Sequence, residues 1–460
     1  MPAYEIIVVG FLISFIVSLF TGFPIAWLLG GLSLIFAWIG ITLYHVFDVD
    51  TFMLADWSRF AILVDRIWNQ MENWVLVSLP NFVFMGLMLD RSGVAETMMR
   101  NFAGLFGRFN GGLALTVVLI GILLAASTGI VGASVVLLAV LSLPLMLEQG
   151  YSKKLASGVV AASGTLGILI PPSIMLVIMA DQLGLSVGDL FMGAVFPGLL
   201  LGGLYLLYVI LVGLFFPKAA PHPPNLEPVS WRLVRDTLLS ILAPLFLILA
   251  VLGSIFAGIA TPTEASGLGA FGATLLAAAN RRLDWATLRE VSRETALTTA
   301  FIFGIFLGAT AFALVMRSLG GDELVAETLK ALPFDPNGIV VFILAIAFVA
   351  GFFLDWLEIT LIVLPVAYPI VRMLDLGEHV ARPELMLWFA ILVAINFQNS
   401  FLTPPFGFAL FYLKGTAGER VRIEEVYRGI VPFVLLQLIG LLLVIAYPDI
   451  ALWLPRAMQS

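Results

Sequence analysis

Two short segments place hydroxyl and carboxamide side chains beside a Pro-Pro pair inside apolar sequence. The first, 163–173, reads SGTLGILIPPS, and the second, 396–407, reads NFQNSFLTPPFG. Proline removes a backbone N–H from a helix, so each pair frees carbonyl groups that need other partners in lipid. Paired interruptions at corresponding positions of two halves are the sequence pattern of a midplane substrate and ion site, so the breaks indicate a transporter.

The oxygens around the first break suit a hard cation such as Na⁺, because hydroxyls and unwound backbone carbonyls are its usual ligands. Around the first break the candidates are Ser163, Gly164, Thr165, Gly167 and Ser173. Around the second break, four polar side chains lie within eight residues of membrane-depth sequence, namely Asn396, Gln398, Asn399 and Thr403, and the first three are candidates for binding the substrate. For any one of these side chains the alternative is a hydrogen bond across helices that repairs the kink.

A third polar run, AASTGIVGAS at 125–134, lies in the uncharged stretch 111–147. Its candidates for binding an anionic substrate or a sodium ion are Ser127, Thr128, Gly129, Gly132 and Ser134. Close packing of helices through small residues is the alternative. The run is poorly suited to a continuous helix that faces lipid. We therefore interpret 111–147 and the similar stretch 338–371 as re-entrant hairpins rather than as pairs of short crossings.

Two acidic residues, Asp355 and Glu358, lie in the apolar sequence of the second hairpin. Each charge near the bilayer centre costs about 2.5–3.5 kcal/mol, so an intramembrane acid is a functional hypothesis by default. Asp355 is a candidate sodium ligand, and the alternative is that it caps the second half-helix of the hairpin. The sequence favours no specific role for Glu358.

The composition is that of a polytopic helical membrane protein. The 460 residues are 61% hydrophobic and only 12% charged, and their mean hydropathy is +1.07. There is no cysteine, which excludes disulfides and thiolate metal sites. The motifs HExxH and Walker A are absent, so transport powered by ATP within this chain is excluded and a membrane-embedded enzyme remains only a remote alternative.

The apolar stretches define the predicted spans. Those long enough to cross a bilayer lie near 5–22, 23–46, 74–90, 155–180, 190–216, 237–257, 264–280, 295–316, 384–413 and 429–448. The amphipathic segment 57–73 is predicted to lie along the interface, and 285–294 precedes the next span in the same way. The segment 258–267 is predicted to be a helix N-terminus, with Pro262 and Glu264 in the first turn.

With both hairpins re-entrant, 16 of the 23 Lys and Arg residues fall in loops on one side of the membrane. The positive-inside rule makes that side cytoplasmic, so both termini are expected to face outward.

The two halves of the chain resemble each other. Val-Ala-Glu-Thr occurs at 94–97 and 325–328, Asn-Gly at 110–111 and 337–338, and Pro-Pro at 171–172 and 404–405. In the topology above the matched elements run in opposite directions. The sequence therefore predicts an inverted repeat in which each half contains an amphipathic segment, a span, a hairpin, a broken span and a closing span.

These motifs together resemble the large membrane subunit (DctM-like) of tripartite ATP-independent periplasmic (TRAP) transporters, and the resemblance covers nearly the whole chain. Its motifs, in order, are TGFP (21–24), LPNFVFMG (79–86), STGIVGAS (127–134), GILIPPS (167–173), GIATPTEA (258–265), GFFLDW (351–356) and LTPPFG (402–407). The resemblance implies a sodium-driven elevator importer of the ion transporter superfamily, in the bacterial inner membrane. It thus implies an all-α polytopic fold with two re-entrant hairpins and two broken helices.

The resemblance also implies site residues and partners. The family's sodium sites carry over to Ser127, Thr128, Gly129, Thr165, Pro171 and Pro172 in the first half, and to Thr403, Pro404 and Pro405 in the second. The expected partners are a small membrane subunit (DctQ-like) and a periplasmic substrate-binding protein (DctP-like), which delivers an organic acid. The chain begins directly with its own first span, so the small subunit is expected to be separate. Na⁺ is the expected coupling ion, with no organic cofactor and no nucleic-acid partner.

The family's division into moving and static parts implies five segments here. Residues 1–110 would hold scaffold spans and the first arm helix, 111–190 and 338–428 the two halves of the transport domain, 191–337 further scaffold spans with the second arm helix, and 429–460 the closing span. The first hairpin tip departs from the commoner Gly-Ser-x-Val-Ala pattern. Such variants look like the subgroup linked to 2-oxo acids, mannitol or chloroaromatic acids rather than C4-dicarboxylates. An autonomous sodium/carboxylate symporter of similar architecture is the alternative within transport.

Overall fold

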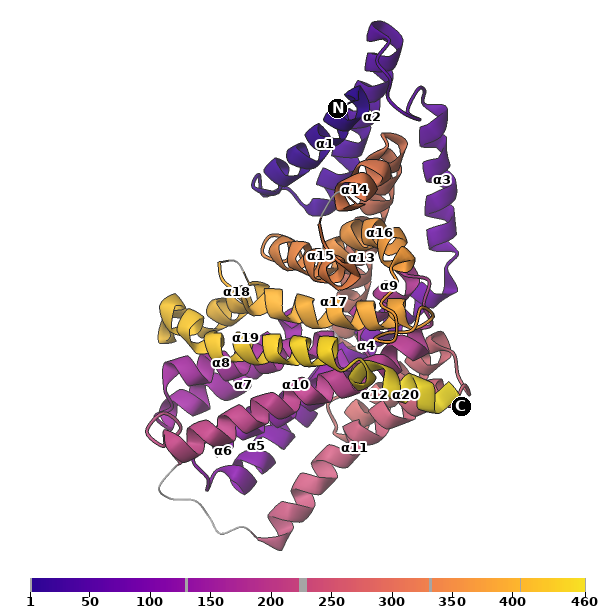
Figure 1. Ribbon diagram of the computed structural model, residues 1–460. Coiled ribbons are helices and arrows are strands. Elements are labelled where there is room, and N and C mark those ends of the chain that lie inside the picture. The colour runs from indigo at the N-terminus through magenta and orange to yellow at the C-terminus, as the bar shows by residue number, and fades with distance from the viewer. Residues whose placement is uncertain (1, 129–130, 223–229, 331–332, 406, 460) are drawn as a thin grey trace. The chain divides into compact units, whose positions relative to one another are not determined.

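The computed structural model describes residues 2–128, 131–222, 230–330, 333–405 and 407–459, and every regular element in these ranges is a helix (Figure 1). Nine of the described helices are long and apolar enough to cross a membrane. This confirms the predicted all-helical polytopic fold. The chain divides into two compact units, which are described separately.

The first unit comprises residues 1–74, 297–346 and 353–386. Its helices are α1 (Ala3–Leu19), α2 (Ile25–Phe47), α3 (Ser58–Met71), most of α13 (Trp285–Ser318), α14 (Gly321–Lys330), α15 (Pro336–Ala350) and α16 (Trp356–Met373). Phe11 in α1 stacks on Phe312 in α13, with ring centroids 4.4 Å apart. Helix α3 buries none of its residues within the chain. Its charged and apolar side chains form an amphipathic helix, which fits the predicted interfacial position.

The second unit comprises residues 75–296, 347–352 and 387–460. Its helices are α4 (Ser78–Arg91), α5 (Val94–Phe106), α6 (Gly112–Thr128), α7 (Val131–Glu148), α8 (Lys153–Thr165), α9 (Ile174–Gln182), α10 (Val187–Phe215), α11 (Trp231–Phe256), α12 (Pro262–Ala279), α17 (Leu385–Leu402), α18 (Phe408–Ala417), α19 (Ile423–Ala446) and α20 (Asp449–Gln459). The 3₁₀ segments are η1 (Trp74–Val77), η2 (Leu166–Ile168) and η3 (Gly418–Arg420). Residues 155–180 and 387–402 are buried throughout, so the two broken segments form the core of this unit.

The order of elements repeats along the chain, as the sequence predicted. Helices α4, α6–α7, α8–α9 and α10 recur as α13, α15–α16, α17–α18 and α19. Residues 285–294 are not a separate helix but are continuous with the following span in the single 34-residue helix α13; their interfacial position stays a prediction. Residues 285–303 contain neither proline nor glycine, so no residue in this stretch favours ending the helix before the span.

Three short helices were absent from the sequence prediction. Helices α5 and α14 carry the repeated Val-Ala-Glu-Thr motif, and α20 follows the last span. All three are 10 to 13 residues long, too short to register as spans. The N-terminus at Thr261 is confirmed: Thr261 and Glu264 form a capping box with Pro262 in the first turn. The division into two compact units does not say which segments move. The assignment of scaffold and transport segments therefore stays a prediction.

Candidate ion and substrate site

The first break is a buried interruption between α8 and α9. Helix α8 tightens into η2, and the Pro171–Pro172 peptide bond that follows is cis. The Thr165 hydroxyl donates to the Ala162 carbonyl at 2.8 Å, and the Ser173 hydroxyl donates to the Ile168 carbonyl at 2.7 Å. Side-chain hydroxyls therefore satisfy two of the backbone carbonyls at this break.

The second break repeats the arrangement between α17 and α18, where the Pro404–Pro405 bond is also cis. The Thr403 hydroxyl donates to the Asn399 carbonyl at 2.8 Å. The Tyr427 hydroxyl donates to the Pro405 carbonyl at 3.1 Å. In both breaks the threonine commits its hydrogen to the preceding turn, which leaves its oxygen able to accept a donor or bind a cation.

Four buried polar side chains connect the two halves next to the first break. The Gln398 amide nitrogen lies 3.5 Å from both the Thr165 and the Tyr205 hydroxyl oxygens. The Gln437 amide donates to the same Tyr205 hydroxyl at 2.6 Å. All four side chains have no exposed surface. We call Thr165, Tyr205, Gln398 and Gln437 the polar network. It joins helices α8, α10, α17 and α19.

Several buried polar atoms near the breaks lack a hydrogen-bond partner among the described residues. They are Gln398 Oε1, Gln437 Oε1, Ser163 Oγ and both side-chain polar atoms of Asn399. Buried polar atoms are nearly always paired in proteins. A group of them left unpaired is typical of a place that receives water, an ion or a ligand.

The first hairpin approaches the first broken helix closely. A Cβ atom at Gly121 in α6 would lie 2.6 Å from the Ser163 Cβ atom, and one at Gly164 would lie 2.5 Å from a Val135 methyl carbon in α7. At Gly351, just after α15, a Cβ atom would collide with the Ser400 side chain in α17. Small residues therefore let the first hairpin lie against the polar segment of α8.

The predicted site residues have different outcomes. Thr165, Gly167, Pro171 and Pro172 share the buried first break, and Thr165 meets Gln398. Asn396 and Asn399 are buried in α17, whereas Thr403 and Pro404 are partly exposed and Pro405 is exposed. Ser134 is buried in α7. Gly129 and the side chains of Ser127 and Thr128 lie outside the described residues.

The two acidic residues of the second hairpin, Asp355 and Glu358, belong to the first unit. Asp355 is the N-cap of α16 and accepts a hydrogen bond from the Trp356 backbone N–H at 2.8 Å. The capping alternative is therefore confirmed for Asp355. The role of Asp355 as a sodium ligand stays a prediction. Glu358, in the first turn of the same helix, is 2% exposed, and its Oε2 atom has no hydrogen-bond partner among the described residues.

Sequence reasoning missed Tyr205 and Gln437, which lie in helices assigned to the scaffold and the closing span. A signal was present, because Gln437 is the single side chain with hydrogen-bonding capacity between Arg428 and Tyr447. A lone polar residue in an apolar span usually faces a partner inside the bundle. Among the described residues no group of three His, Asp or Glu side chains could hold a metal ion, so an ion here would depend mainly on neutral oxygens.

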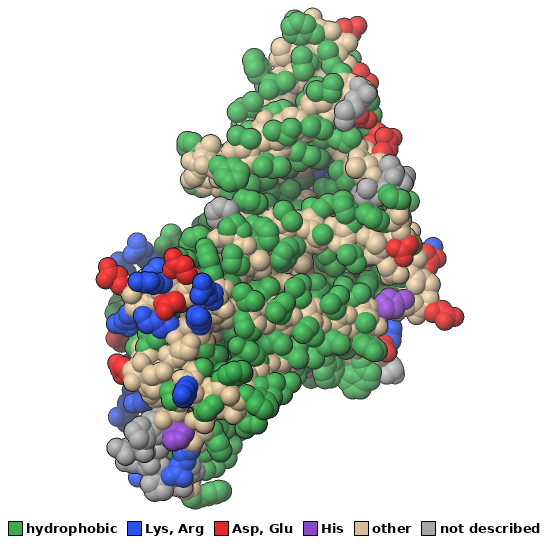
Figure 2. Space-filling view, turned by 60° about the vertical axis from the view of Figure 1, so that its left-hand side comes forward, with side chains coloured by type: hydrophobic (Ala, Val, Ile, Leu, Met, Phe, Trp, Pro, Cys, Tyr) green, Lys and Arg blue, Asp and Glu red, His purple; other side chains and the backbone are tan. Residues whose placement is uncertain are grey.

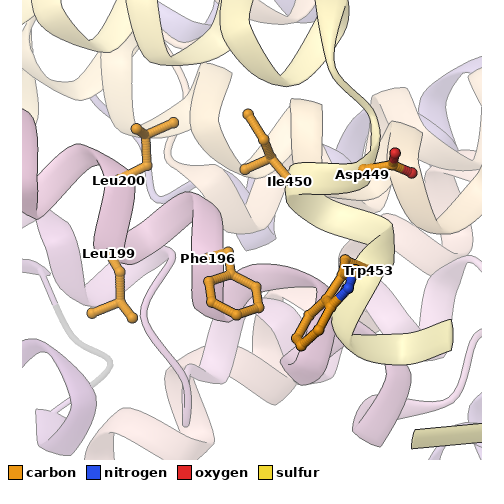
Figure 3. A pocket seen from close by; sticks show the side chains of 6 residues that line it. All are labelled: Phe196, Leu199, Leu200, Asp449, Ile450 and Trp453. Atoms are coloured by element: carbon orange, nitrogen blue, oxygen red, sulfur yellow. The ribbon is translucent and has the colours of Figure 1, made fainter. Parts of the chain in front are cut away.

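The outer surface differs from this interior. Figure 2 shows broad apolar areas, with Lys and Arg side chains gathered together at one side of the view. An apolar surface pocket of about 690 Å³ lies between α10 and α20 and is lined by Phe196, Leu199, Leu200, Asp449, Ile450 and Trp453 (Figure 3). It contains none of the predicted site residues, and its apolar lining suits lipid rather than an organic acid.

Comparison with known proteins identifies one transporter family. Residues 12–450 match the family model described as "Tripartite ATP-independent periplasmic transporter, DctM component". The chain is 31% identical to the C4-dicarboxylate TRAP transporter large permease protein DctM of Rhodobacter capsulatus, over 98% of both chains. It is 27% identical to the isethionate TRAP transporter permease protein DctMQ of Oleidesulfovibrio alaskensis, over 84% of this chain and 59% of that one.

The fold also resembles that of a solved transporter. The crystal structure of the Alcanivorax borkumensis YdaH transporter, described as having an unusual topology, superimposes with a TM-score of 0.59 over 99% of both chains. The sequences are only 13% identical, so this similarity concerns the fold alone.

Proposed function

We propose a specific transport reaction on the premise that this chain belongs to the DctM family, the large membrane components of tripartite ATP-independent periplasmic transporters. It is a multi-pass inner-membrane protein and a TRAP transporter large permease. Its relatives are named as permeases, which confirms the expectation that it is not an enzyme. The proposed reaction is sodium-coupled import of a small organic acid. The observation that carries it is the family match along nearly the whole chain.

The oxygen groups at the two breaks support Na⁺ as the coupling ion. Thr165 and Thr403 each keep oxygen lone pairs after bonding to their own helix, and Asn399 has an unpaired carboxamide oxygen. A ligand set made mainly of neutral oxygens suits a singly charged hard cation. The proposed sodium ligands are Ser127, Gly129, Thr165, Gly167, Pro171, Pro172, Asp355, Thr403, Pro404 and Pro405.

An organic anion is the proposed substrate. The relatives above are named for a C4-dicarboxylate and for isethionate, both small organic anions. Amide and hydroxyl groups in an apolar interior can bind a carboxylate through hydrogen bonds. The proposed substrate-binding residues are Ser127, Thr128, Gly129, Ser134, Asn396, Gln398 and Asn399.

The tripartite family description supports two partners, a small membrane subunit and a periplasmic binding protein. The match to the relative named DctMQ covers 59% of that relative's length. The proposed mechanism is an elevator movement of the hairpins and broken helices against the remaining spans.

Reconstitution tests the proposal. Organic acids are first screened for thermal stabilisation of the binding protein, and the acid that binds is then used, radiolabelled, with proteoliposomes. We expect uptake only when an inward Na⁺ gradient, the small subunit and the binding protein are all present. Uptake by this chain alone would instead identify an autonomous sodium/carboxylate symporter, and uptake that is equal in K⁺ medium would contradict sodium coupling.

A further inference from the structure

We propose that Tyr205 and Gln437 are positioning residues of the ion site, which hold the Gln398 carboxamide in a fixed orientation beside the proposed sodium ligand Thr165. Gln398, proposed above to bind substrate, then also offers its oxygen to the ion. This inference rests on the proposed sodium coupling. It assigns a function to two residues in the closing helices of the two halves, α10 and α19.

The Tyr205 side chain is fixed at both its ring and its hydroxyl. Phe433 in α19 packs edge-to-face on the ring, with centroids 5.2 Å apart and an interplanar angle of 83°. Gln437 follows Phe433 by four residues and therefore lies on the same face of the helix. Its amide donates to the Tyr205 hydroxyl at 2.6 Å. One face of α19 thus determines where the tyrosine oxygen lies.

The tyrosine oxygen in turn orients Gln398. The Gln398 amide nitrogen is 3.5 Å from both the Tyr205 and the Thr165 hydroxyl oxygens. A carboxamide has two N–H donors, so two acceptors on the nitrogen side determine where its oxygen points. That oxygen, Gln398 Oε1, is buried and unpaired among the described residues. The network therefore presents an oriented oxygen acceptor next to the first break.

A role in stability alone does not explain this arrangement. Tyr205, Gln398 and Gln437 have no exposed surface, and two of the amide oxygens are left without donors. Unpaired buried oxygens oppose folding, and apolar side chains of the same size would avoid that cost. Partners outside the ligand shell are known to set the orientation of metal ligands, which is the role the contacts indicate here.

The test measures Na⁺ binding by the purified full chain in detergent, as the rise in melting temperature with NaCl at constant ionic strength against choline chloride. We expect Tyr205→Phe to raise the Na⁺ concentration for half-maximal stabilisation about tenfold, in the range typical for lost partners of metal ligands. Tyr208→Phe is the matched control. Tyr208 lies on the same helix and packs on the same Phe433 ring at 5.1 Å, but it is outside the polar network. We expect it to leave the sodium midpoint unchanged.

A double variant separates positioning from packing. Tyr205→Phe combined with Gln437→Leu removes both polar partners, which should restore much of the stability lost by Gln437→Leu alone. A positioning role predicts that the sodium midpoint stays raised in this variant although stability recovers. Recovery of both properties together would overturn the inference, and so would a normal midpoint in Tyr205→Phe. A wild-type chain with no Na⁺ response would instead overturn the sodium coupling on which the inference rests.

Discussion

Gln398 and Thr165 are 233 residues apart in the chain, yet the amide nitrogen of the one lies 3.5 Å from the hydroxyl oxygen of the other. The two Pro-Pro pairs, at 171–172 and 404–405, are separated by the same 233 positions. Tyr205 and Gln437, which also bond to each other, are 232 positions apart. The polar network is therefore built from equivalent positions of the two halves, and it lies where the two repeats meet.

The threonines at the breaks provide the first prediction. We expect Thr165→Val and Thr403→Val to weaken the sodium dependence of uptake at least severalfold with little effect on assembly, because each removes an oxygen while nearly conserving volume. The measurement is the initial rate of uptake into proteoliposomes as a function of Na⁺ concentration.

Thr310→Val is the control for both variants. The Thr310 hydroxyl in α13 donates to the Phe306 carbonyl at 2.7 Å, so its removal breaks the same kind of bond in a helix without a Pro-Pro break. An unchanged sodium response in all three variants would show that the hydroxyls at the breaks only pair with their own helix.

Two substitutions of Asp355 separate its role as a helix cap from a role of its charge in sodium binding. Asp355→Ala should destabilise the protein by about 0.5–2 kcal/mol, because the N-cap acceptor for α16 is lost. Asp355→Ser keeps a capping oxygen and should recover most of that stability, as measured by thermal unfolding in detergent. If Asp355 also binds Na⁺, the Ser variant will remain defective in sodium-dependent uptake, and normal uptake by this variant would reduce Asp355 to a cap.

The sequence predicted those features that depend on local chemistry or on composition. The Pro-Pro breaks, the amphipathic helix α3 and the cap at Thr261 follow from what proline, spaced charges and a Thr-Pro-Thr-Glu segment do to a helix. Tyr205 and Gln437 were not predicted, because their contacts are distant in sequence. Tyr205 meets Gln398 over 193 positions and Gln437 over 232 positions. Residues 155–180 and 387–402 are buried on every side, so no hydrophobic periodicity indicates which of their faces meets a partner.

A close helix crossing supports the polar network and provides the third prediction. A Cβ atom at Gly158 in α8 would collide with the Gly429 carbonyl of α19 and lie 3.0 Å from the Phe433 ring. Gly158→Ala should therefore push α19 outward and destabilise the protein by about 1–3 kcal/mol, the usual cost of overpacking. Gly203→Ala in α10 is the control, since a Cβ there meets nothing within 4 Å. A thermal unfolding midpoint for Gly158→Ala equal to that of Gly203→Ala would contradict the crossing.

The last prediction concerns the membrane topology, which the absence of cysteine makes easy to test. Single cysteines are placed at Thr97 and Lys153, which flank the first hairpin, and at Asn337 and Glu378, which flank the second; all four residues are exposed. The re-entrant interpretation puts the first two in the cytoplasm and the last two outside. An impermeant maleimide applied to spheroplasts should therefore label 337 and 378, and should label 97 and 153 only after the membrane is permeabilised. Labelling of 97 and 153 from opposite faces would mean that the chain between them crosses the membrane an odd number of times, which is incompatible with both the hairpin and the inverted repeat.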